Sequence, residues 1–193
     1  MDRKGRPEPL SDERLRAVTV GELSPLDGSI LLVPYDPDWP RMYAAFERQI
    51  RAALGAKVLL LEHVGSTSVP GLSAKPIIDM VMAMPDSADE GSYVAPLERI
   101  GFVLKIREPD WFEHRLLKAP AIDGNLHVFS RACAEIDRML AFRDWLRTND
   151  DDRMLYERAK HELAARHWKY TQNYADAKSA VVSEILGRAL GAT

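Results

Sequence analysis

The chain has 193 residues and a formal net charge of −3, with 46% hydrophobic and 28% charged residues. This is ordinary globular composition with enough apolar side chains for a sizeable core, and its weak negative charge argues against binding of bulk nucleic acid. One cysteine, Cys133, excludes an intrachain disulfide and a cysteine-based zinc site, and no apolar run approaches the roughly 20 residues that cross a bilayer.

The first residues predict an arm that precedes the main domain. Met-Asp-Arg-Lys-Gly-Arg-Pro has no hydrophobic run after its charges, so we expect no secretory signal and a cytoplasmic protein with no membrane partner. Residues 1–29 surround one weakly periodic segment, Glu13–Val20, and predict an arm with one short helix. Residues 30–193 have a length and composition that predict a single domain.

Three elements are predicted between the arm and the middle of the chain. Ile30–Tyr35 is a short strand candidate. Asp38 and Pro40 are typical of a helix start, apolar residues recur at helical spacing after them, and Gly55 predicts the helix end. Val58–Glu62 is an apolar run of strand length.

The next stretch combines a bend of small residues with an acid inside a strand. Gly65–Ser73 holds two glycines, three serines, a threonine and a proline, which is typical of a loop, and Ile77–Met84 predicts a buried strand that contains Asp79. A carboxylate in an apolar strand costs several kcal/mol if it is dry and without a partner, so we expect a cation, a donor or a wet cleft beside it. Glycines let a backbone approach a phosphate, and Lys75 adds a cation, so this stretch predicts an anion site beside a carboxylate.

Beyond this stretch the sequence predicts strands first and helices afterwards. A helix through Val94 ends at Gly101, and three strand candidates and three helices follow. The strand candidates are Phe102–Ile106, Trp111–Lys118 and Asn125–Phe129, and the helices are Ala134–Thr148, Arg153–Trp168 and Gln172–Leu190. Tight turns between strands favour an antiparallel or mixed sheet, so the predicted fold class is α+β (mixed α/β) with a helical C-terminal portion.

The central stretch also resembles a known family. Gly65-Ser-Thr-Ser-Val-Pro-Gly-Leu72 and Ala74-Lys-Pro-Ile-Ile-Asp79 resemble the signature of the GrpB family, with weaker similarity from Val33–Pro40 to the C-terminal helix. GrpB proteins are small bacterial proteins that are placed by fold in the nucleotidyltransferase superfamily. The resemblance therefore implies a nucleotidyltransferase-like mixed sheet with packed helices, and it supplies no substrate.

The resemblance also implies a metal site. Superfamily members hold divalent metal with an acid-x-acid pair that follows a Gly-Ser pair; Gly65, Ser66 and Asp79 match that spacing, but Val81 stands in place of the second acid. His127 is the candidate for the position of the third acid, because it points away from its apolar strand neighbours and imidazole can bind metal or carry a proton. Asp79 and His127 are thus the predicted catalytic and metal-binding residues, with Mg²⁺ as the expected ion.

The remaining candidates are groups that would hold phosphate. They are Gly65, Ser66, Thr67, Ser68 and Lys75 in and after the bend, and Arg115, Arg143 and Lys178 elsewhere. Each has a structural alternative: an ion pair for Arg115, a solvated helix face for the helix cations including Lys160, and a hydrogen bond to a neighbour for His127. For Asp79 the alternative is a structural carboxylate that caps loop N–H groups.

These features lead to one hypothesis for function and one alternative. The leading hypothesis is a metal-dependent nucleotidyltransferase-like enzyme that acts on a nucleotide or another phosphorylated small molecule. Because two-metal phosphoryl transfer needs several carboxylates and Val81 replaces one of them, the alternative is a non-catalytic nucleotide- or phosphate-binding module of the same fold.

Overall fold

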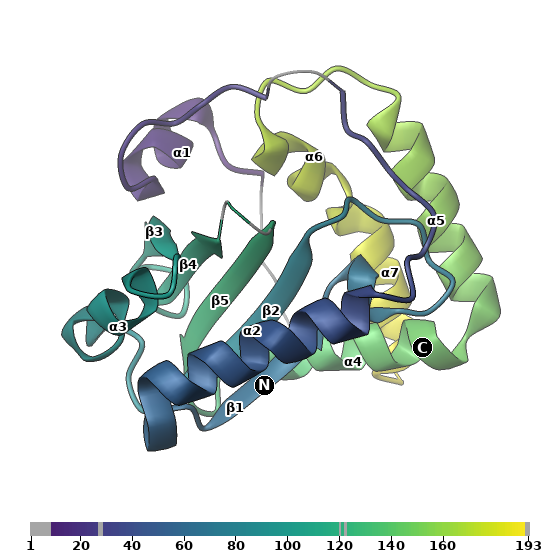
Figure 1. The fold of residues 1–193 in the computed structure, drawn as a ribbon. Coiled ribbons are helices and arrows are strands. Elements are labelled where there is room, and N and C mark those ends of the chain that lie inside the picture. The colour runs from purple at the N-terminus through teal and green to yellow at the C-terminus, as the bar shows by residue number, and fades with distance from the viewer. Residues whose placement is uncertain (1–8, 27–28, 120, 122, 192–193) are drawn as a thin grey trace.

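The computed structural model describes residues 9–26, 29–119, 121 and 123–191, and a five-stranded mixed sheet lies at the centre of this part of the chain (Figure 1). The strands are β1 (Leu60–Val64), β2 (Ile78–Met84), β3 (Val103–Glu108), β4 (His114–Ala119) and β5 (Gly124–Ser130). They lie in the order β1-β2-β5-β4-β3, with β2 and β5 parallel and all other neighbours antiparallel. The sheet is therefore mixed, as the sequence predicts.

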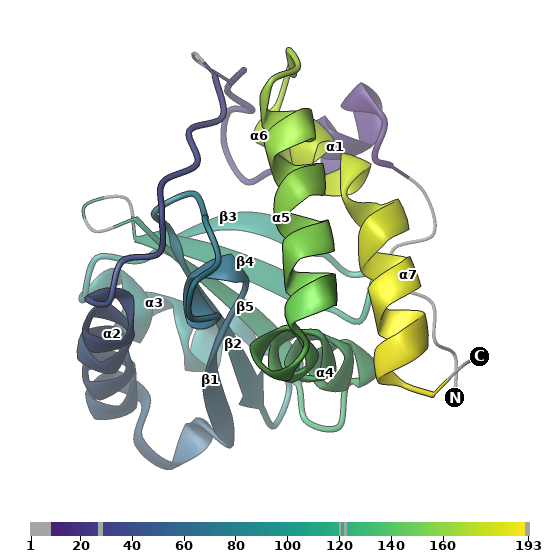
Figure 2. The same cartoon turned by 90° about the vertical axis from the view of Figure 1, so that its right-hand side faces the viewer.

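Helices pack on both faces of the sheet (Figure 2). The α-helices are α1 (Asp12–Val18), α2 (Trp39–Leu54), α3 (Val94–Glu98), α4 (Ala134–Thr148), α5 (Asp150–Ala164), α6 (Thr171–Ala177) and α7 (Ser179–Ala189), and the short 3₁₀ turns are η1 (Gly55–Lys57), η2 (Ser66–Ser68) and η3 (Glu90–Ser92). The helices α2 and α3 cover one face, and α4 contacts the other and carries α5 and α7 behind it. This arrangement confirms the predicted α+β class with a helical C-terminal portion.

The main core lies between the sheet and α2. Phe46, Ile50 and Leu54 recur every four residues on α2 and are buried, and Gly55 ends the helix with a φ of 57°, as predicted. Gly124 of β5 allows the helix to pack this closely, because a Cβ atom there would lie 2.6 Å from Cζ of Phe46.

Alternation along β2 gives the two faces of the sheet different chemistry. Met80 and Met82 point to α2 and are fully buried in the main core. Asp79 and Val81 point to the opposite face, where Val81 belongs to a smaller apolar cluster that α4 covers through Ile136. The polar end of β2 therefore lies on the face of the C-terminal helices.

Three predicted strands differ from the structure, and the one predicted at Val58–Glu62 lies two residues later, at Leu60–Val64. Ile30–Tyr35 is not a strand: Val33 makes an isolated bridge with Ala74, with N–H···O distances of 2.9 Å in both directions. The strand predicted to start at Trp111 starts at His114, because Phe112 and Glu113 have left-handed backbones with φ of 55° and 50°.

Two C-terminal helices differ in their limits. The helix predicted to start at Arg153 starts at Asp150, because the Asn149 side chain caps it by accepting a hydrogen bond from the N–H of Asp152 at 3.1 Å. The predicted final helix is divided into α6 and α7, which meet at Lys178. The division turns the chain at this lysine.

The N-terminal segment links the sheet edge to the C-terminal helices. Its helix α1 confirms the predicted short helix, and residues 1–8 and 27–28 of the predicted arm lie outside the described residues. Thr19 makes an isolated bridge with Ile106 of β3, and the N–H of Leu10 donates to Asp176 of α6 at 3.0 Å. No helix in the described ranges is long and apolar enough to span a membrane.

Candidate functional site

Polar side chains gather where β2 and β5 begin and β4 ends. Asp79, Asn125 and Lys118 are paired across these three adjacent strands, so their side chains lie on the same face of the sheet. The Asn125 amide donates a hydrogen bond of 2.8 Å to Oδ1 of Asp79. Asn125 therefore fixes the orientation of the carboxylate.

The bend after β1 lies directly against this carboxylate. Gly65 has a φ of 68°, and a Cβ atom at this position would lie 2.6 Å from Oδ2 of Asp79, so only glycine fits here without displacement. The short turn η2 follows; the Ser68 hydroxyl donates to the carbonyl of Gly65 at 2.6 Å, and that of Thr67 to the carbonyl of Ile77 at 3.1 Å. The structure thus brings together the bend and the acid that the sequence singled out.

Three lysines from separate segments lie near Asp79 and the bend. Lys75 follows the bend, Lys160 comes from α5, and Lys178 comes from the joint between α6 and α7. The Lys160 side chain is only 2% exposed, and its ammonium donates to Oγ of Ser66 at 3.2 Å and to the carbonyl of Ser73. Among the described residues none of these lysines forms an ion pair with a carboxylate.

Burial and mutual repulsion lower the pKa values of these lysines. Burial, with a further contribution from Lys178, lowers the pKa of Lys160 to about 7 and that of Lys75 to about 8. Burial also lowers the pKa of Lys178, against the opposing effect of Asp79 and Asp176. The charged form of each of the three lysines is therefore disfavoured in the folded protein.

Two tyrosines complete the walls around the lysines. The ammonium of Lys178 lies 4.7 Å and that of Lys75 5.8 Å from the ring centroid of Tyr174, and the ammonium of Lys160 lies 4.9 Å from that of Tyr156. The Tyr174 hydroxyl is buried and has no hydrogen-bond partner among the described residues. A buried hydroxyl without a partner is uncommon and marks a place where a ligand or water can bind.

Asp79 is half-buried and not sealed inside the protein. Burial raises the pKa of Asp79, whereas the hydrogen bond from Asn125 and the charges of Lys75 and Lys178 lower it. Among the described residues its hydrogen bond comes from the Asn125 side chain and not from loop N–H groups, so within this part of the chain Asp79 does not cap the loop.

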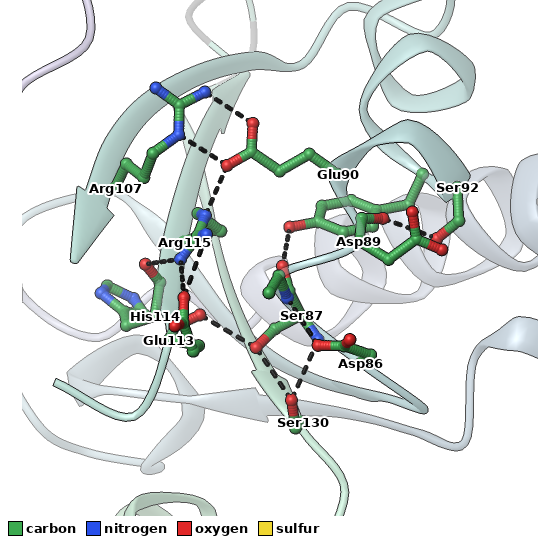
Figure 3. A network of polar contacts seen from close by, with 12 residues as sticks. Asp86, Ser87, Asp89, Glu90, Ser92, Arg107, Glu113, His114, Arg115 and Ser130 are labelled. Atoms are coloured by element: carbon green, nitrogen blue, oxygen red, sulfur yellow. Dashed lines mark hydrogen bonds and ion pairs between the residues drawn. The ribbon is translucent and has the colours of Figure 1, made fainter. Parts of the chain in front are cut away.

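Arg115, a predicted phosphate ligand, lies on the opposite face of the sheet from Asp79. Figure 3 shows its guanidinium between Glu90 and Glu113. Its guanidinium contacts Glu90 at 2.6 Å and Glu113 at 3.2 Å, and Arg107 binds the same Glu90 carboxylate. The ion-pair alternative therefore describes Arg115, which ties the η3 turn to β4 and is not part of the lysine cluster.

Arg143, a second predicted phosphate ligand, lies on α4 beside β1. It donates to Oε2 of Glu62 at 2.8 Å, to the carbonyl of His63 at 2.9 Å and to Asp144 at 2.7 Å. Its charge is thus shared between two carboxylates, and it lines a cavity that includes Ser68 and Pro70 of the bend and none of the three lysines.

His127 shares the face of Asp79 but makes different contacts. Its Nδ1 lies 3.0 Å from Nε2 of His114, and Nδ1 of His114 lies 2.8 Å from the buried carboxylate of Glu108. In the β2–β5 register His127 stands opposite Val81, one pair of facing positions beyond Asp79. The alternative of a strand histidine bonded to a neighbour describes these contacts.

The residues present do not fit a metal held by the protein. In the described part of the chain no three His, Cys, Asp or Glu residues gather in a way that could hold a metal ion. Val81, at the position of the second acid, is fully buried in an apolar cluster, and the lysines around Asp79 make its surroundings positive. The Mg²⁺ ion expected from the sequence stays a prediction.

Sequence reasoning missed residues from α5 and β5. Lys160 was assigned to a solvated helix face, and Tyr156 and Asn125 were not considered. One signal was present: Tyr156 and Lys160, like Tyr174 and Lys178, are four residues apart, which places a ring beside an amine on the same helix face. That pattern alone does not show that the face is buried.

Comparisons with known proteins agree on one family. The family model described as GrpB protein matches residues 29–188. A UPF0157 protein, BH1888 of Halalkalibacterium halodurans, is 58% identical and covers 94% of this chain and 93% of its own length. The crystal structure of the conserved protein GrpB from Enterococcus faecalis has a TM-score of 0.74 and 31% identity, and covers 84% of this chain and 98% of its own.

A further relative is a longer protein. A dephospho-CoA kinase of Mycolicibacterium paratuberculosis is 27% identical over 71% of this chain, and the matched part is 40% of that kinase. The solved relative is consistent with the nucleotidyltransferase-like fold that the sequence predicts.

Proposed function

We propose that this chain, which belongs to the GrpB family, binds the phosphate groups of a nucleotide or another phosphorylated small molecule among Lys75, Lys160 and Lys178. The observation that carries the proposal is the gathering of three buried or half-buried ammonium groups that form no ion pair with any residue that the structure describes. Like charges in a medium of low dielectric repel strongly, and a polyanion would replace that repulsion with charge-assisted hydrogen bonds.

The neighbouring groups suit the same ligand. Lys160 already contacts the hydroxyl of Ser66, so phosphate bound there would lie at the start of the bend. The buried hydroxyl of Tyr174 would donate a hydrogen bond that it lacks among the described residues. Asp79, which is half-buried beside these lysines, would accept a hydrogen bond from a ligand hydroxyl.

The second candidate function is transfer of a phosphorus-containing group, as in the nucleotidyltransferases. Two features favour it: Asp79 lies against the Gly65 bend, and Lys160 has a pKa near neutrality, which suits a group that gives or takes a proton. The apolar surroundings of Val81 argue against a second acid in a metal cluster. The name of the dephospho-CoA kinase relative supports a phosphorylated small molecule as ligand, although the match covers 40% of that protein.

Calorimetry with tripolyphosphate tests the proposal without assuming a base or sugar. We expect saturable binding in EDTA, and a loss of at least about tenfold in affinity in Lys160→Met, because one charge-assisted contact contributes about 1.5 to 3 kcal/mol. Lys105→Met, which changes an exposed lysine on β3, is the matched control and should bind as the wild type does. Absence of binding in EDTA together with binding in Mg²⁺ would favour the metal-dependent candidate.

A further inference from the structure

A cavity of about 380 Å³ is lined by Ser68 and Pro70 of the bend and by none of the three lysines. It is lined by Tyr35, by Tyr43 at the start of α2, by residues of β1 and the bend, and by Arg143 and Arg147 of α4. Its volume is within the range of about 300 to 1,000 Å³ that is common for small-molecule sites, and its rings and guanidinium groups are surfaces on which a flat ligand can stack.

The charges that line this cavity are balanced, unlike those of the lysine cluster. Arg143 is bonded to the carboxylates of Glu62 and Asp144, at 2.8 and 2.7 Å. Arg147 directs Nε and Nη2 to the carbonyl of Ser68, at 3.0 and 2.9 Å, and lies 3.4 Å from Asp144. Because both arginines already have acceptors, the cavity suits an uncharged polar group better than a second phosphate.

The hydrogen bonds of His63 identify what that group must offer. The Thr67 hydroxyl gives its proton to the carbonyl of Ile77, so its oxygen accepts the Nε2–H of His63 at 3.0 Å. Burial and the nearby arginines lower the pKa of His63 to about 4, so the ring is neutral and its Nδ1 is an acceptor. Nδ1 has no hydrogen-bond partner among the described residues. Nδ1 and the Glu62 carboxylate both line the cavity as acceptors, so a ligand with N–H donors would complement them.

The cavity and the lysine cluster are next to each other. Ser66 contacts Lys160, whereas Ser68 lines the cavity, and only Thr67 lies between them. Consecutive Cα atoms are 3.8 Å apart, so the Cα atoms of the two serines are at most about 7.6 Å apart. A ligand with a phosphate chain at one end and a ring at the other is longer than this separation.

We propose that the cavity binds an amino-bearing heteroaromatic base whose phosphates lie among the lysines, so that the ligand class is a nucleotide. The inference rests on the proposed function and narrows it. Tyr35 supplies a ring on which the base can stack. It is half-buried and its ring contacts Trp39 edge-on, at a centroid distance of 5.3 Å, so its substitution should disturb the fold little. Glu62 and His63 supply the acceptors.

Calorimetry in EDTA with tripolyphosphate, ATP and ITP tests the inference. In the wild type we expect ATP to bind about tenfold tighter than tripolyphosphate, as one stacked base contributes. ITP should bind more weakly than ATP. Its base carries a carbonyl at the position where adenine carries an amino group, and that amino group would donate hydrogen bonds to Glu62 and His63. Tyr35→Ala should bring ATP to the affinity of tripolyphosphate and leave tripolyphosphate unchanged, and the control Phe112→Ala, an exposed ring, should change neither.

The outcomes separate the two proposals. Equal affinities for ATP and tripolyphosphate, unaffected by Tyr35→Ala, would overturn the base site and leave the lysine site standing. If tripolyphosphate does not bind, the lysine site fails, and adenosine then decides the cavity. Saturable adenosine binding that Tyr35→Ala removes supports the base site, and no adenosine binding overturns it.

Discussion

The protonation of Lys160 should make the stability of the protein depend on pH in a way that one substitution removes. The folded pKa is about 7, against 10.5 as the ordinary value for lysine. Because the folded pKa is lowered, the unfolded chain binds more protons than the folded one between these values, so stability rises with pH there, and the penalty is fully present below about 7.

The size of the effect follows from the two pKa values. Linkage gives a gain in unfolding free energy of roughly 2 to 3 kcal/mol for this one group between about pH 6 and pH 9. Lys160→Met keeps the unbranched shape and most of the length of the side chain and removes the titrating group. The unfolding free energy of the wild type minus that of the variant should therefore increase by that amount from pH 6 to pH 9. The side chain is 2% exposed, so solvent screening does not reduce the effect much.

Urea unfolding followed by tryptophan fluorescence measures the difference at each pH. Lys105→Met is the matched control, and its difference from the wild type should not vary with pH, because the residue is exposed. Saturating tripolyphosphate should flatten the wild-type curve, because a bound anion favours the charged ammonium. If the unfolding free energies of the wild type and Lys160→Met differ by a constant amount from pH 6 to 9, the pKa of Lys160 is not lowered by burial in the folded protein.

Three further substitutions test other parts of the structure. Gly65→Ala should lower the unfolding free energy by about 1 to 3 kcal/mol, because its Cβ would meet Asp79 and its backbone is left-handed, and by more than Gly55→Ala, whose Cβ would have open space; urea unfolding of both compares them. Asp79→Asn should keep or tighten tripolyphosphate binding in EDTA, because it removes a negative charge beside the phosphates, and a calorimetric loss of binding would contradict the lysine site. Arg115→Met should lower the unfolding free energy by about 1.5 to 3 kcal/mol, because it removes the charged hydrogen bonds of Arg115 to Glu90 and Glu113 while Arg107 still pairs with Glu90, and the tripolyphosphate affinity should stay at the wild-type value.

The parts of the site that are close in the sequence could be predicted from it. The bend and Asp79 lie within one strand–bend–strand unit, so composition and spacing were enough to place Gly65 against the carboxylate's strand. The same holds for α2, where Pro40, the apolar spacing and Gly55 specify the start, the face and the end of the helix. Local signals of this kind do not depend on the rest of the fold.

The parts that come from distant segments could not be predicted. Lys160 is 94 residues from the serine that it contacts, and a buried lysine looks the same in the sequence as a solvated one. The sequence could not decide between a phosphate ligand and an ion pair for Arg115. His114 to Leu117 are all buried, so β4 has no alternation of exposed and buried residues that would show which face Arg115 lies on. The strand predicted at Ile30–Tyr35 failed for a related reason: its apolar residues pack against the core and helices while its backbone makes one bridge.

The N-terminal segment has a consequence for how the molecule behaves in concentrated solution. β3 is the last strand of the sheet, and an outer strand offers its backbone groups to any other chain that can pair with them. Part of this sheet edge is already paired: Thr19 makes its bridge there, and the N–H of Val20 donates to the carbonyl of Lys105 at 2.8 Å. Proteolytic removal of this segment would therefore expose unpaired backbone groups of β3, and we expect the trimmed protein to self-associate through this edge.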